Sequence, residues 1–328
     1  MTEPTTAVAV LAPVHRRLLE WLSARAVVHH DPAATAVDPS TPGVARARVL
    51  VLRSNVRLTA ADLASLPRLE LVLRAGSGTD NLDLAALRER GVEVVVVGGG
   101  PSAPAVAELA LQSALSLLRR VPVATAEMAA GRWAKDACLG EELTGTTVGV
   151  WGAGPVGRAA ARLFTRTDAE VRFAEHPGVP PTERTLPPRR LAATAGVHVF
   201  ALPLRPETRG TVDRAMLDVL RDRRPHLVNV GRWDLFDMPE VIRALSLGEL
   251  AGVAVDPVER QHLPLAAELV ARFSEPHRPL NLQLTPHLGA TTPEAHRRVA
   301  LAAIDALAAR WEPMRHHEGS DSHTREVR

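Results

Sequence analysis

The feature that most constrains this chain is an apolar strand that runs directly into a glycine-rich turn. Residues 147–157 read Thr-Val-Gly-Val-Trp-Gly-Ala-Gly-Pro-Val-Gly, and a helical pattern over 158–164 follows. Gly152 permits a tight turn, Gly154 lets a pyrophosphate approach the backbone, and Gly157 allows the helix to pack closely on the strand. The free N–H groups and positive dipole end of the helix favour phosphate groups. The pattern predicts a dinucleotide site in an α/β domain.

An acidic residue in the right place indicates which dinucleotide would bind. Glu175 closes the next predicted strand, 23 residues after Gly152. Its carboxylate can accept hydrogen bonds from ribose hydroxyls and would repel a 2′-phosphate, so we expect NAD rather than NADP. Proline lacks an N–H group but suits the first helical position. The expected cofactor-binding residues here are Gly152, Gly154, Pro155, Val156, Gly157 and Glu175.

Short apolar runs alternate with helical patterns along most of the chain, which is typical of parallel sheets covered by helices on both faces. A stretch with a proline-rich composition, 177–188, is expected to be an irregular surface loop. The longest helical pattern covers 105–120. The expected strands cover residues 49–52, 69–73, 92–97, 147–151, 171–174, 197–202, 226–230, 250–255 and 282–285.

Composition excludes several classes of protein. The chain has 328 residues, 46% of them hydrophobic, and a net charge of only +2. It has no basic block interleaved with aromatic residues, so nucleic-acid binding is not expected. No apolar run is long enough to span a membrane, and residues 1–14 do not resemble a secretory signal. The single cysteine, Cys138, fits a reducing cytoplasm, and no metal site is expected.

Candidate catalytic residues follow three separate predicted strands. Arg232 comes after 226–230, Asp256 ends 250–255 with Gln261 five residues later, and His287 comes after 282–285. In a parallel sheet the ligand crevice lies outside the carboxyl ends of the strands. Histidine suits proton transfer near neutral pH, and arginine suits a carboxylate because of its bidentate fork. The set indicates hydride transfer at a carbon that bears oxygen, next to an anionic group.

Seven segments in a fixed order, spread over roughly residues 49–300, resemble the D-2-hydroxyacid dehydrogenase family, nearest its phosphoglycerate dehydrogenase branch. Besides the glycine-rich turn, they are 74–83 (Arg-Ala-Gly-Ser-Gly-Thr-Asp-Asn-Leu-Asp), 106–108 (Val-Ala-Glu), 202–209 (Leu-Pro-Leu-Arg-Pro-Glu-Thr-Arg), 228–232 (Val-Asn-Val-Gly-Arg), 255–256 (Val-Asp) and 285–289 (Thr-Pro-His-Leu-Gly). The resemblance implies two Rossmann-like domains with parallel sheets, the nucleotide domain (105–287) being inserted into a substrate domain (1–104 plus 288–328). It also implies a homodimer built around the 105–120 helix.

The same resemblance implies roles for individual residues. Arg232 would hold the substrate carboxylate, His287 would be the acid/base, and Asp256 would hold the nicotinamide carboxamide. Substrate-anion binding falls on Arg53 and on the backbone of Gly76, Ser77 and Gly78.

The sequence departs from the family pattern in three places. The glutamate that usually partners the histidine falls at position 261, which is Gln261. Glu259, two residues earlier, is an alternative partner, although a two-residue shift usually moves a side chain elsewhere. The glycine expected after the arginine is Trp233, whose indole we expect to reshape the pocket or the local backbone. The family's Asn-x-Pro turn before the long helix falls on residues 97–101, Val-Gly-Gly-Gly-Pro.

These observations predict an NAD-dependent oxidoreductase for a small anionic 2-hydroxy acid, 2-keto acid, or phosphate or phosphonate analogue, in a specialised pathway. We expect no C-terminal regulatory domain of the kind that long phosphoglycerate dehydrogenases carry. Two alternatives stay open. Gln261 also fits oxidation of formate or phosphite, which needs no base for a hydroxyl group, and a non-catalytic NAD-binding regulator would keep the fold without turnover.

Overall fold

The computed structural model describes residues 6–176, 182, 184–274 and 278–316. The chain divides into two compact units. The first combines Met1–Ser102 with Thr292–Arg328, and the second is Ala103–Thr291. The sequence analysis places the boundaries after residues 104 and 287, two and four residues away from these.

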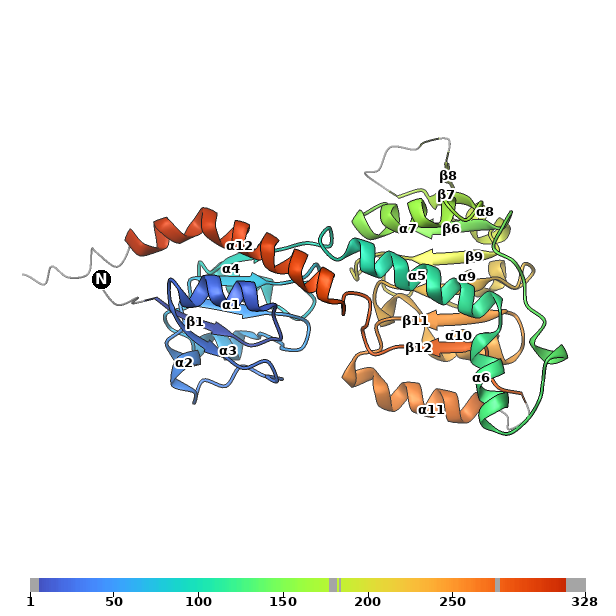
Figure 1. The fold of residues 1–328 in the computed structure, drawn as a ribbon, viewed down its shortest axis with the longest axis horizontal. Coiled ribbons are helices and arrows are strands. Elements are labelled where there is room, and N and C mark those ends of the chain that lie inside the picture. Colours follow the sequence, from blue (N-terminus) through green and yellow to red (C-terminus); the bar gives the residue numbers. More distant parts are fainter. Residues whose placement is uncertain (1–5, 177–181, 183, 275–277, 317–328) are drawn as a thin grey trace, which may run out of the picture. The chain divides into compact units, whose positions relative to one another are not determined.

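The first unit is a five-stranded parallel sheet with strand order β2-β1-β3-β4-β5 (Figure 1). Its first two strands are short and were not predicted from the sequence. The strands are β1 (Ala7–Val10), β2 (Val27–His30), β3 (Val49–Leu52), β4 (Leu71–Arg74) and β5 (Glu93–Val96). The helices are α1 (Arg16–Ser23), α2 (Pro42–Ala45), α3 (Ala60–Ala64), α4 (Leu84–Glu89) and α12 (Pro293–His316).

The second unit is a seven-stranded parallel sheet with strand order β12-β11-β10-β9-β6-β7-β8. The strands are β6 (Thr147–Trp151), β7 (Glu170–Ala174), β8 (Thr185–Leu186), β9 (Val197–Phe200), β10 (His226–Asn229), β11 (Gly252–Val255) and β12 (Leu282–Leu284). The helices are α5 (Ala103–Leu118), α6 (Val121–Ala129), α7 (Pro155–Thr165), α8 (Pro188–Thr194), α9 (Arg214–Leu220), α10 (Met238–Ser246) and α11 (Leu263–Phe273). Three 3-10 turns are η1 (Asp136–Cys138), η2 (Trp233–Leu235) and η3 (Arg260–His262).

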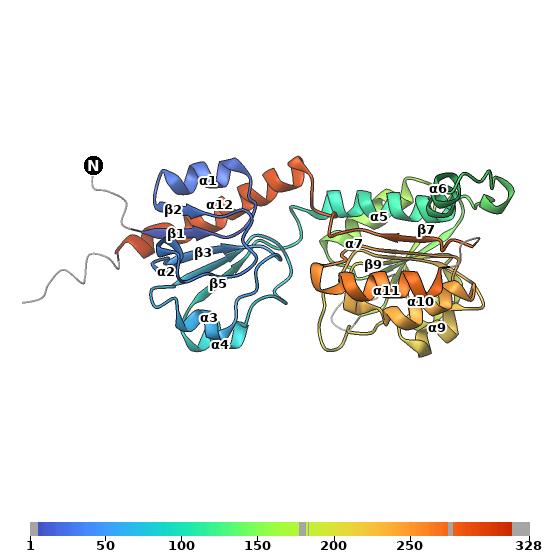
Figure 2. The same cartoon turned by 90° about the horizontal axis from the view of Figure 1, so that it is seen from below.

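Each sheet is buried on both faces, as parallel sheets require. In the first unit, alternate residues of β1 point into different cores: Val8 and Val10 pack with α1 and α12, while Ala9 packs on the side of α3 and α4. In the second unit, α5 and α7 cover one face, and α8 to α11 cover the other. Figure 2 shows these layers within each unit.

Small side chains let α5 approach α7 and the sheet closely. Ala107, Ala110 and Ala114 on α5 are fully buried, and they share a core with Ala160 and Phe164 of α7. Alanine has a high helix propensity, and its small side chain leaves room for the backbone of a neighbouring helix. The small residues of α5 thus allow this helix to pack beside α7 on the same face of the seven-stranded sheet.

The expected irregular loop at 177–188 contains regular structure at its end. Residues 177–181 and 183 lie outside the described part, but β8 follows and α8 begins at Pro188. The density of prolines was misleading here, because proline is well suited to the first turn of a helix.

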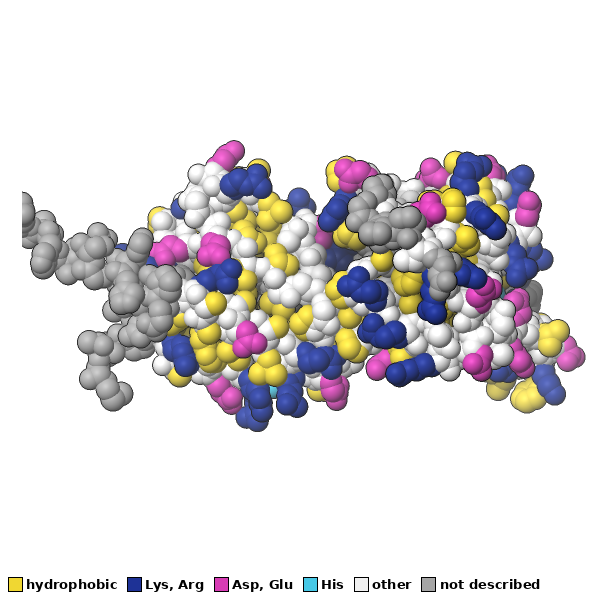
Figure 3. Space-filling view, turned by 90° about the horizontal axis from the view of Figure 1, so that it is seen from above, with side chains coloured by type: hydrophobic (Ala, Val, Ile, Leu, Met, Phe, Trp, Pro, Cys, Tyr) yellow, Lys and Arg dark blue, Asp and Glu magenta, His cyan; other side chains and the backbone are white. Residues whose placement is uncertain are grey.

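On the face drawn in Figure 3, Lys and Arg side chains of the second unit are interspersed with Asp and Glu and with hydrophobic side chains. Among the described helices, none combines the length and apolarity needed to cross a bilayer.

A buried histidine lies beside the strand that leads into the glycine-rich turn. His198 on β9 is fully buried, and its Nδ1 accepts a hydrogen bond of 3.1 Å from Nε1 of Trp151 at the end of β6. Desolvation lowers the pKa of His198 to about 3. Between pH 6.5 and about 3 the unfolded chain therefore binds a proton at this position that the native protein does not, and acidification destabilises the native state.

We expect His198→Asn, which keeps a hydrogen-bond acceptor but does not titrate, to flatten the loss of stability below pH 6.5. As the pH falls, the free energy of unfolding of the wild type should decrease more steeply than that of His198→Asn, by as much as about 1.4 kcal/mol per pH unit. Urea unfolding at a series of pH values between 7 and 4.5 measures the difference. His30→Asn, on the exposed His30 of β2, is the control. Parallel curves for wild type and His198→Asn would contradict the prediction.

Candidate functional site

The glycine-rich turn after β6 has the geometry that a dinucleotide needs. Gly152 has φ = +109°, and a Cβ there would lie 2.7 Å from the carbonyl oxygen of Ala201. A Cβ on Gly157 would lie 1.8 Å from the carbonyl oxygen of Gly152, so only glycine lets α7 pack this closely. A Cβ on Gly154 would meet nothing within 4 Å, which leaves the backbone open to a ligand. The three glycines thus meet three different steric demands.

The elements around this turn complete a cradle for NAD. Pro155 opens α7 and Gly154 is its N-cap, so the N-terminal N–H groups near Val156 face the turn with the positive end of the helix dipole. Glu175 directly follows β7, its side chain is exposed, and its amide donates a 2.9 Å hydrogen bond to the carbonyl oxygen of Leu186. The residues present therefore fit a pyrophosphate at the turn and ribose hydroxyls at Glu175.

A buried carboxylate organises the loop that carries His287. Asp256, at the end of β11, is 5% exposed. Its Oδ1 accepts hydrogen bonds from Oγ1 of Thr285 (2.8 Å) and the amide of Leu288 (2.6 Å), and its Oδ2 accepts one from the amide of Gly289 (2.9 Å). His287 between them has φ = +59°, a left-handed conformation that costs a non-glycine residue energy and persists where the surroundings enforce it. Asp256 therefore positions the loop, a role that the sequence did not indicate.

The carboxylate next to His287 belongs to Glu259. Its Oε1 lies 3.8 Å from Nδ1 of His287, and the two side chains are 18% and 33% exposed. Gln261 donates a 2.6 Å hydrogen bond from Nε2 to Oε2 of Glu259. The 3-10 turn η3 brings the side-chain amide of Gln261 back to Glu259. The negative charge of Glu259 therefore lies beside His287, although Glu259 stands two residues before the position that the family pattern predicts. Sequence reasoning favoured position 261, because the backbone path after β11 is not visible in the sequence.

The backbone around Arg232 is held by another buried side chain. Asn229, at the end of β10, is fully buried; its Oδ1 accepts from the amide of Gly231 (3.0 Å), and its Nδ2 donates to the carbonyl oxygen of Arg232 (2.8 Å). The guanidinium of Arg232 is half-buried and donates a 2.8 Å hydrogen bond from Nη1 to the carbonyl oxygen of Gly231. The hydrogen bonds of Asn229 thus fix the turn that carries Arg232 directly after β10.

Trp233 packs into the core. Its side chain is 4% exposed, and its indole stacks on the ring of His262 with centroids 5.0 Å apart and planes 9° apart. The side chain thus turns inward and packs against η3, the turn that contains Gln261.

Arg53 in the first unit lies in a desolvated position without a carboxylate. Its Nη1 is 3.1 Å from Nε2 of His296 and 3.4 Å from the carbonyl oxygen of Pro13, and no described residue forms an ion pair with it. Burial lowers the pKa of Arg53. Burial also lowers the pKa of His296, and the charges of Arg53 and His15 lower it further. The sequence did not point to His296, because position 296 lies far from Arg53 in the chain.

The loop at Gly76, Ser77 and Gly78 follows β4. The amide of Gly76 donates a 2.8 Å hydrogen bond to the carbonyl oxygen of Arg74, whereas no described residue accepts from the amides of Ser77 and Gly78. Arg74 is 4% exposed, and its Nε donates to Oδ1 of Asn81 at 3.1 Å. Two of the three expected backbone donors are thus available for an anion, and a buried guanidinium lies beside the loop.

Asn81 connects this loop to Arg53, because its Nδ2 donates a 2.9 Å hydrogen bond to the carbonyl oxygen of Arg53. The predicted site residues accordingly fall into two groups, and each group is connected within its own unit. Arg232, Asp256, Gln261, His287 and the glycine-rich turn lie on the second unit, whereas Arg53 and Gly76–Gly78 lie on the first. In the described part of the chain, no cluster of three or more His, Cys, Asp or Glu side chains could hold a metal ion.

Comparisons with known proteins agree with this geometry. Residues 111–289 match the model of the D-isomer specific 2-hydroxyacid dehydrogenase, NAD binding domain. A hydroxypyruvate reductase of Thermotoga maritima is 30% identical over 262 residues, which are 79% of this chain and 83% of that protein. A D-3-phosphoglycerate dehydrogenase of Rattus norvegicus is 33% identical over 277 residues, but the chain spans only 48% of its length.

The structure of D-lactate dehydrogenase from Aquifex aeolicus, solved with NAD and lactic acid, superposes with a TM-score of 0.77 at 19% identity and covers 95% of this chain and 97% of that one. The NAD-binding domain corresponds to most of the second unit. The glycine-rich turn, the matched domain and the relatives together show that the chain belongs to the NAD-dependent D-isomer specific 2-hydroxyacid dehydrogenase family.

Proposed function

We propose that this protein interconverts a small anionic 2-keto acid and its 2-hydroxy acid, the substrate class including phosphate and phosphonate analogues, as part of a specialised pathway. The observation that carries the proposal is the pair of His287 and Glu259, 3.8 Å apart, on the unit that binds NAD. A histidine supported by a carboxylate is suited to moving the proton of a hydroxyl group. We propose NAD as the preferred dinucleotide because the carboxylate of Glu175 would repel a 2′-phosphate.

The proposed reaction assigns each residue one task. Bound NADH supplies the hydride for reduction. Protonated His287 gives its proton to the carbonyl oxygen, and the resulting hydroxyl group returns it to neutral His287 in the oxidative direction. Arg232 binds the substrate carboxylate through its guanidinium. Asp256 would accept a hydrogen bond from the nicotinamide carboxamide while it also holds the loop of His287.

Substrate-anion contacts are proposed for the first unit. Arg53 is half-buried beside His296 and has no described carboxylate partner, so a second anionic group on the substrate would supply the missing charge. The amides of Ser77 and Gly78 would donate to an anionic oxygen, whereas that of Gly76 already bonds to Arg74. Arg53 and these two amides are therefore the groups of the first unit that we propose for binding anionic oxygens of the substrate.

Two other functions have less support. Oxidation of formate or phosphite was favoured by the neutral Gln261, but the carboxylate of Glu259 beside His287 removes that reason. A non-catalytic NAD-binding regulator would not need Arg232, His287 and Glu259 together.

The substrate class is tested by turnover. Wild-type protein with NADH should reduce members of a panel of 2-keto acids, phosphorylated and phosphonate 2-keto acids included, and should not oxidise formate or phosphite with NAD. Arg232→Ala should lower kcat/KM by at least about a hundredfold, since loss of a charge-assisted bidentate contact costs about 3 kcal/mol or more, while the Kd for NADH stays within about twofold. Arg209→Ala, at an exposed arginine paired with Asp234, is the control. Near-native kcat/KM in Arg232→Ala would exclude the proposed role of this residue.

The role of Glu259 is tested by the pH dependence of kcat/KM in both directions. Glu259→Gln removes a negative charge 3.8 Å from Nδ1 and should lower the pKa of His287. Oxidation needs neutral His287, so its acidic limb should move to lower pH; reduction needs protonated His287, so its alkaline limb should also move to lower pH. Gln261→Glu should move both limbs the opposite way. Glu268→Gln, on the exposed face of α11, is the control. If only Gln261→Glu moved the limbs, Glu259 would not be the partner of the histidine.

We propose further that the protein is a cytoplasmic homodimer assembled through the region of α5. Support comes from large apolar side chains that remain exposed on and beyond this helix: Leu115 (40%), Val121 (46%), Met128 (59%), Trp133 (81%) and Leu139 (86%). Large apolar side chains that stay exposed along one stretch of chain are typical of surfaces that another protein covers.

Sedimentation velocity should therefore give a dimer for the wild type and a shift toward monomer for the double variant Trp133→Glu with Leu139→Glu. Leu247→Glu, a 60% exposed leucine at the end of α10, is the control and should remain dimeric. A wild-type monomer at micromolar concentration would rule out this assembly.

A further inference from the structure

A cavity lies in the NAD-binding unit at the amino ends of the parallel strands, which is the end of the sheet opposite to the glycine-rich turn. Its volume is about 470 Å³. It is lined by residues that directly precede strands: Thr146 before β6, Gly196 before β9, Ala251 before β11 and Asn281 before β12. The glycine-rich turn, Arg232 and His287 all follow the carboxyl ends of strands, so none of them borders this cavity.

The cavity is strongly basic. Among the described residues that line it are four arginines, Arg120, Arg223, Arg224 and Arg278, and one carboxylate, that of Glu141. Among the described residues, none forms an ion pair or side-chain hydrogen bond with any of the four. Two of the guanidinium groups converge: a Cβ built on Gly248 would have Nη2 of Arg224 at 3.6 Å and Nη2 of Arg278 at 3.9 Å. Two cations near one point without a counter-charge repel each other, and an oxyanion between them would relieve the repulsion.

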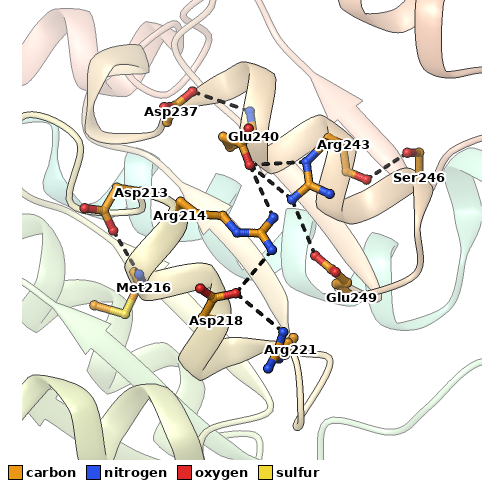
Figure 4. Close-up of polar contacts among 10 residues, drawn as sticks. All are labelled: Asp213, Arg214, Met216, Asp218, Arg221, Asp237, Glu240, Arg243, Ser246 and Glu249. Carbon is orange, nitrogen blue, oxygen red and sulfur yellow. Dashed lines mark hydrogen bonds and ion pairs between the residues drawn. The ribbon is translucent and has the colours of Figure 1, made fainter.

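Neighbouring arginines in the same unit have carboxylate partners (Figure 4). Arg214 lies 3.3 Å from Asp218 and 3.4 Å from Glu240, and Arg243 lies 3.1 Å from Glu240 and 3.9 Å from Glu249. The pair of Arg214 with Glu240 joins α9 to α10, whereas no carboxylate among the described residues pairs with an arginine that lines the cavity.

Buried polar atoms without partners lie at the same cavity. Nε of Arg120 and Oδ1 of Asn281 are both buried, and neither has a hydrogen-bond partner in the described structure. Asn281 is 5% exposed, and its Nδ2 is already used in 2.9 Å hydrogen bonds to the carbonyl oxygens of Leu117 and Ala251. Leaving such groups unpaired costs about 1–3 kcal/mol each. A ligand with an anionic oxygen and a hydroxyl group would satisfy one donor and one acceptor.

The backbone at the cavity is also strained. Arg120 has φ = +53° and Arg224 has φ = +49°, left-handed conformations that a long side chain rarely adopts. Both residues line the cavity, and strain of this kind gathers at ligand-binding positions. Charge, unpaired buried atoms and strain thus coincide on one set of residues.

We propose that this cavity binds a small multivalent oxyanion, a phosphorylated or polycarboxylic metabolite that carries a hydroxyl group. Arg224 and Arg278 clamp one anionic group, Arg120 and Arg223 contact a second, and Oδ1 of Asn281 accepts from the hydroxyl group. The site is distinct from the substrate site proposed above, and it does not depend on which 2-hydroxy acid is turned over.

Calorimetry on the full chain tests this proposal. The protein is first saturated with NADH, so that the glycine-rich turn is filled and cannot bind a free phosphate. Inorganic pyrophosphate and citrate are then titrated separately at constant ionic strength, with acetate as a monovalent reference. We expect saturable binding of one pyrophosphate or one citrate per chain and none of acetate; which of the two binds more tightly distinguishes a phosphate from a carboxylate ligand.

The double variant Arg224→Gln with Arg278→Gln should raise the Kd for the bound anion by about tenfold or more, because each substitution removes a charge-assisted hydrogen bond. Both side chains are exposed, so the variant should fold, and unchanged NADH binding and sedimentation verify this. Arg166→Gln, an exposed arginine that ends α7 at the same end of the sheet and does not line the cavity, is the matched control. An unchanged Kd in the double variant, or no saturable binding of pyrophosphate and citrate, would overturn the proposal.

Discussion

The contact on which the NAD-binding unit depends is the close approach of α7 to the end of β6. A Cβ on Gly157 would lie 1.8 Å from the carbonyl oxygen of Gly152, so the first turn of the helix touches the strand's own turn. This contact directs the helix N-terminus at the open backbone of Gly154. It also lowers α7 onto the sheet, where the alanines of α5 can pack beside it. One steric requirement thus sets both the phosphate cradle and the packing of the layer above it.

Buried polar side chains fix the loops that the sheet itself leaves free. Asn229 ends β10 and holds the turn before Arg232, while Asp256 ends β11 and accepts three hydrogen bonds from the loop of His287. Because a buried polar group without partners is costly, each of these residues allows essentially one conformation of its loop. The reactive side chains are thereby held by the ends of rigid strands, which is the condition for precise positioning of a site.

The arginines of the NAD-binding unit differ in whether a carboxylate lies beside them. Arg214, Arg221 and Arg243 pair with carboxylates, and the pair of Arg214 with Glu240 joins α9 to α10, whereas the arginines of the basic cavity have no described ion pair. Arg53 in the other unit resembles the second group, since its neighbours are a histidine and a carbonyl oxygen. Arg53 is half-buried, and a half-buried guanidinium without a counter-charge is costly for the folded protein, a cost that a bound anion would remove.

The sequence alone determined the class of fold and the place of the cofactor. Apolar runs and glycine spacing depend on local geometry, so the strands from β3 onward, apart from β8, and the turn at Gly152–Gly157 were predicted within a few residues. The strands β1, β2 and β8 were not predicted; β2 and β8 carry too few apolar residues to be recognised. The carboxylate partner of His287, the inward turn of Trp233 and the contact of Arg53 with His296 were decided by the tertiary structure. Each depends on where a loop returns after a strand, or on residues more than two hundred positions apart. The path of a loop and a contact between distant residues leave no periodic signal in the sequence, because packing against other elements sets them.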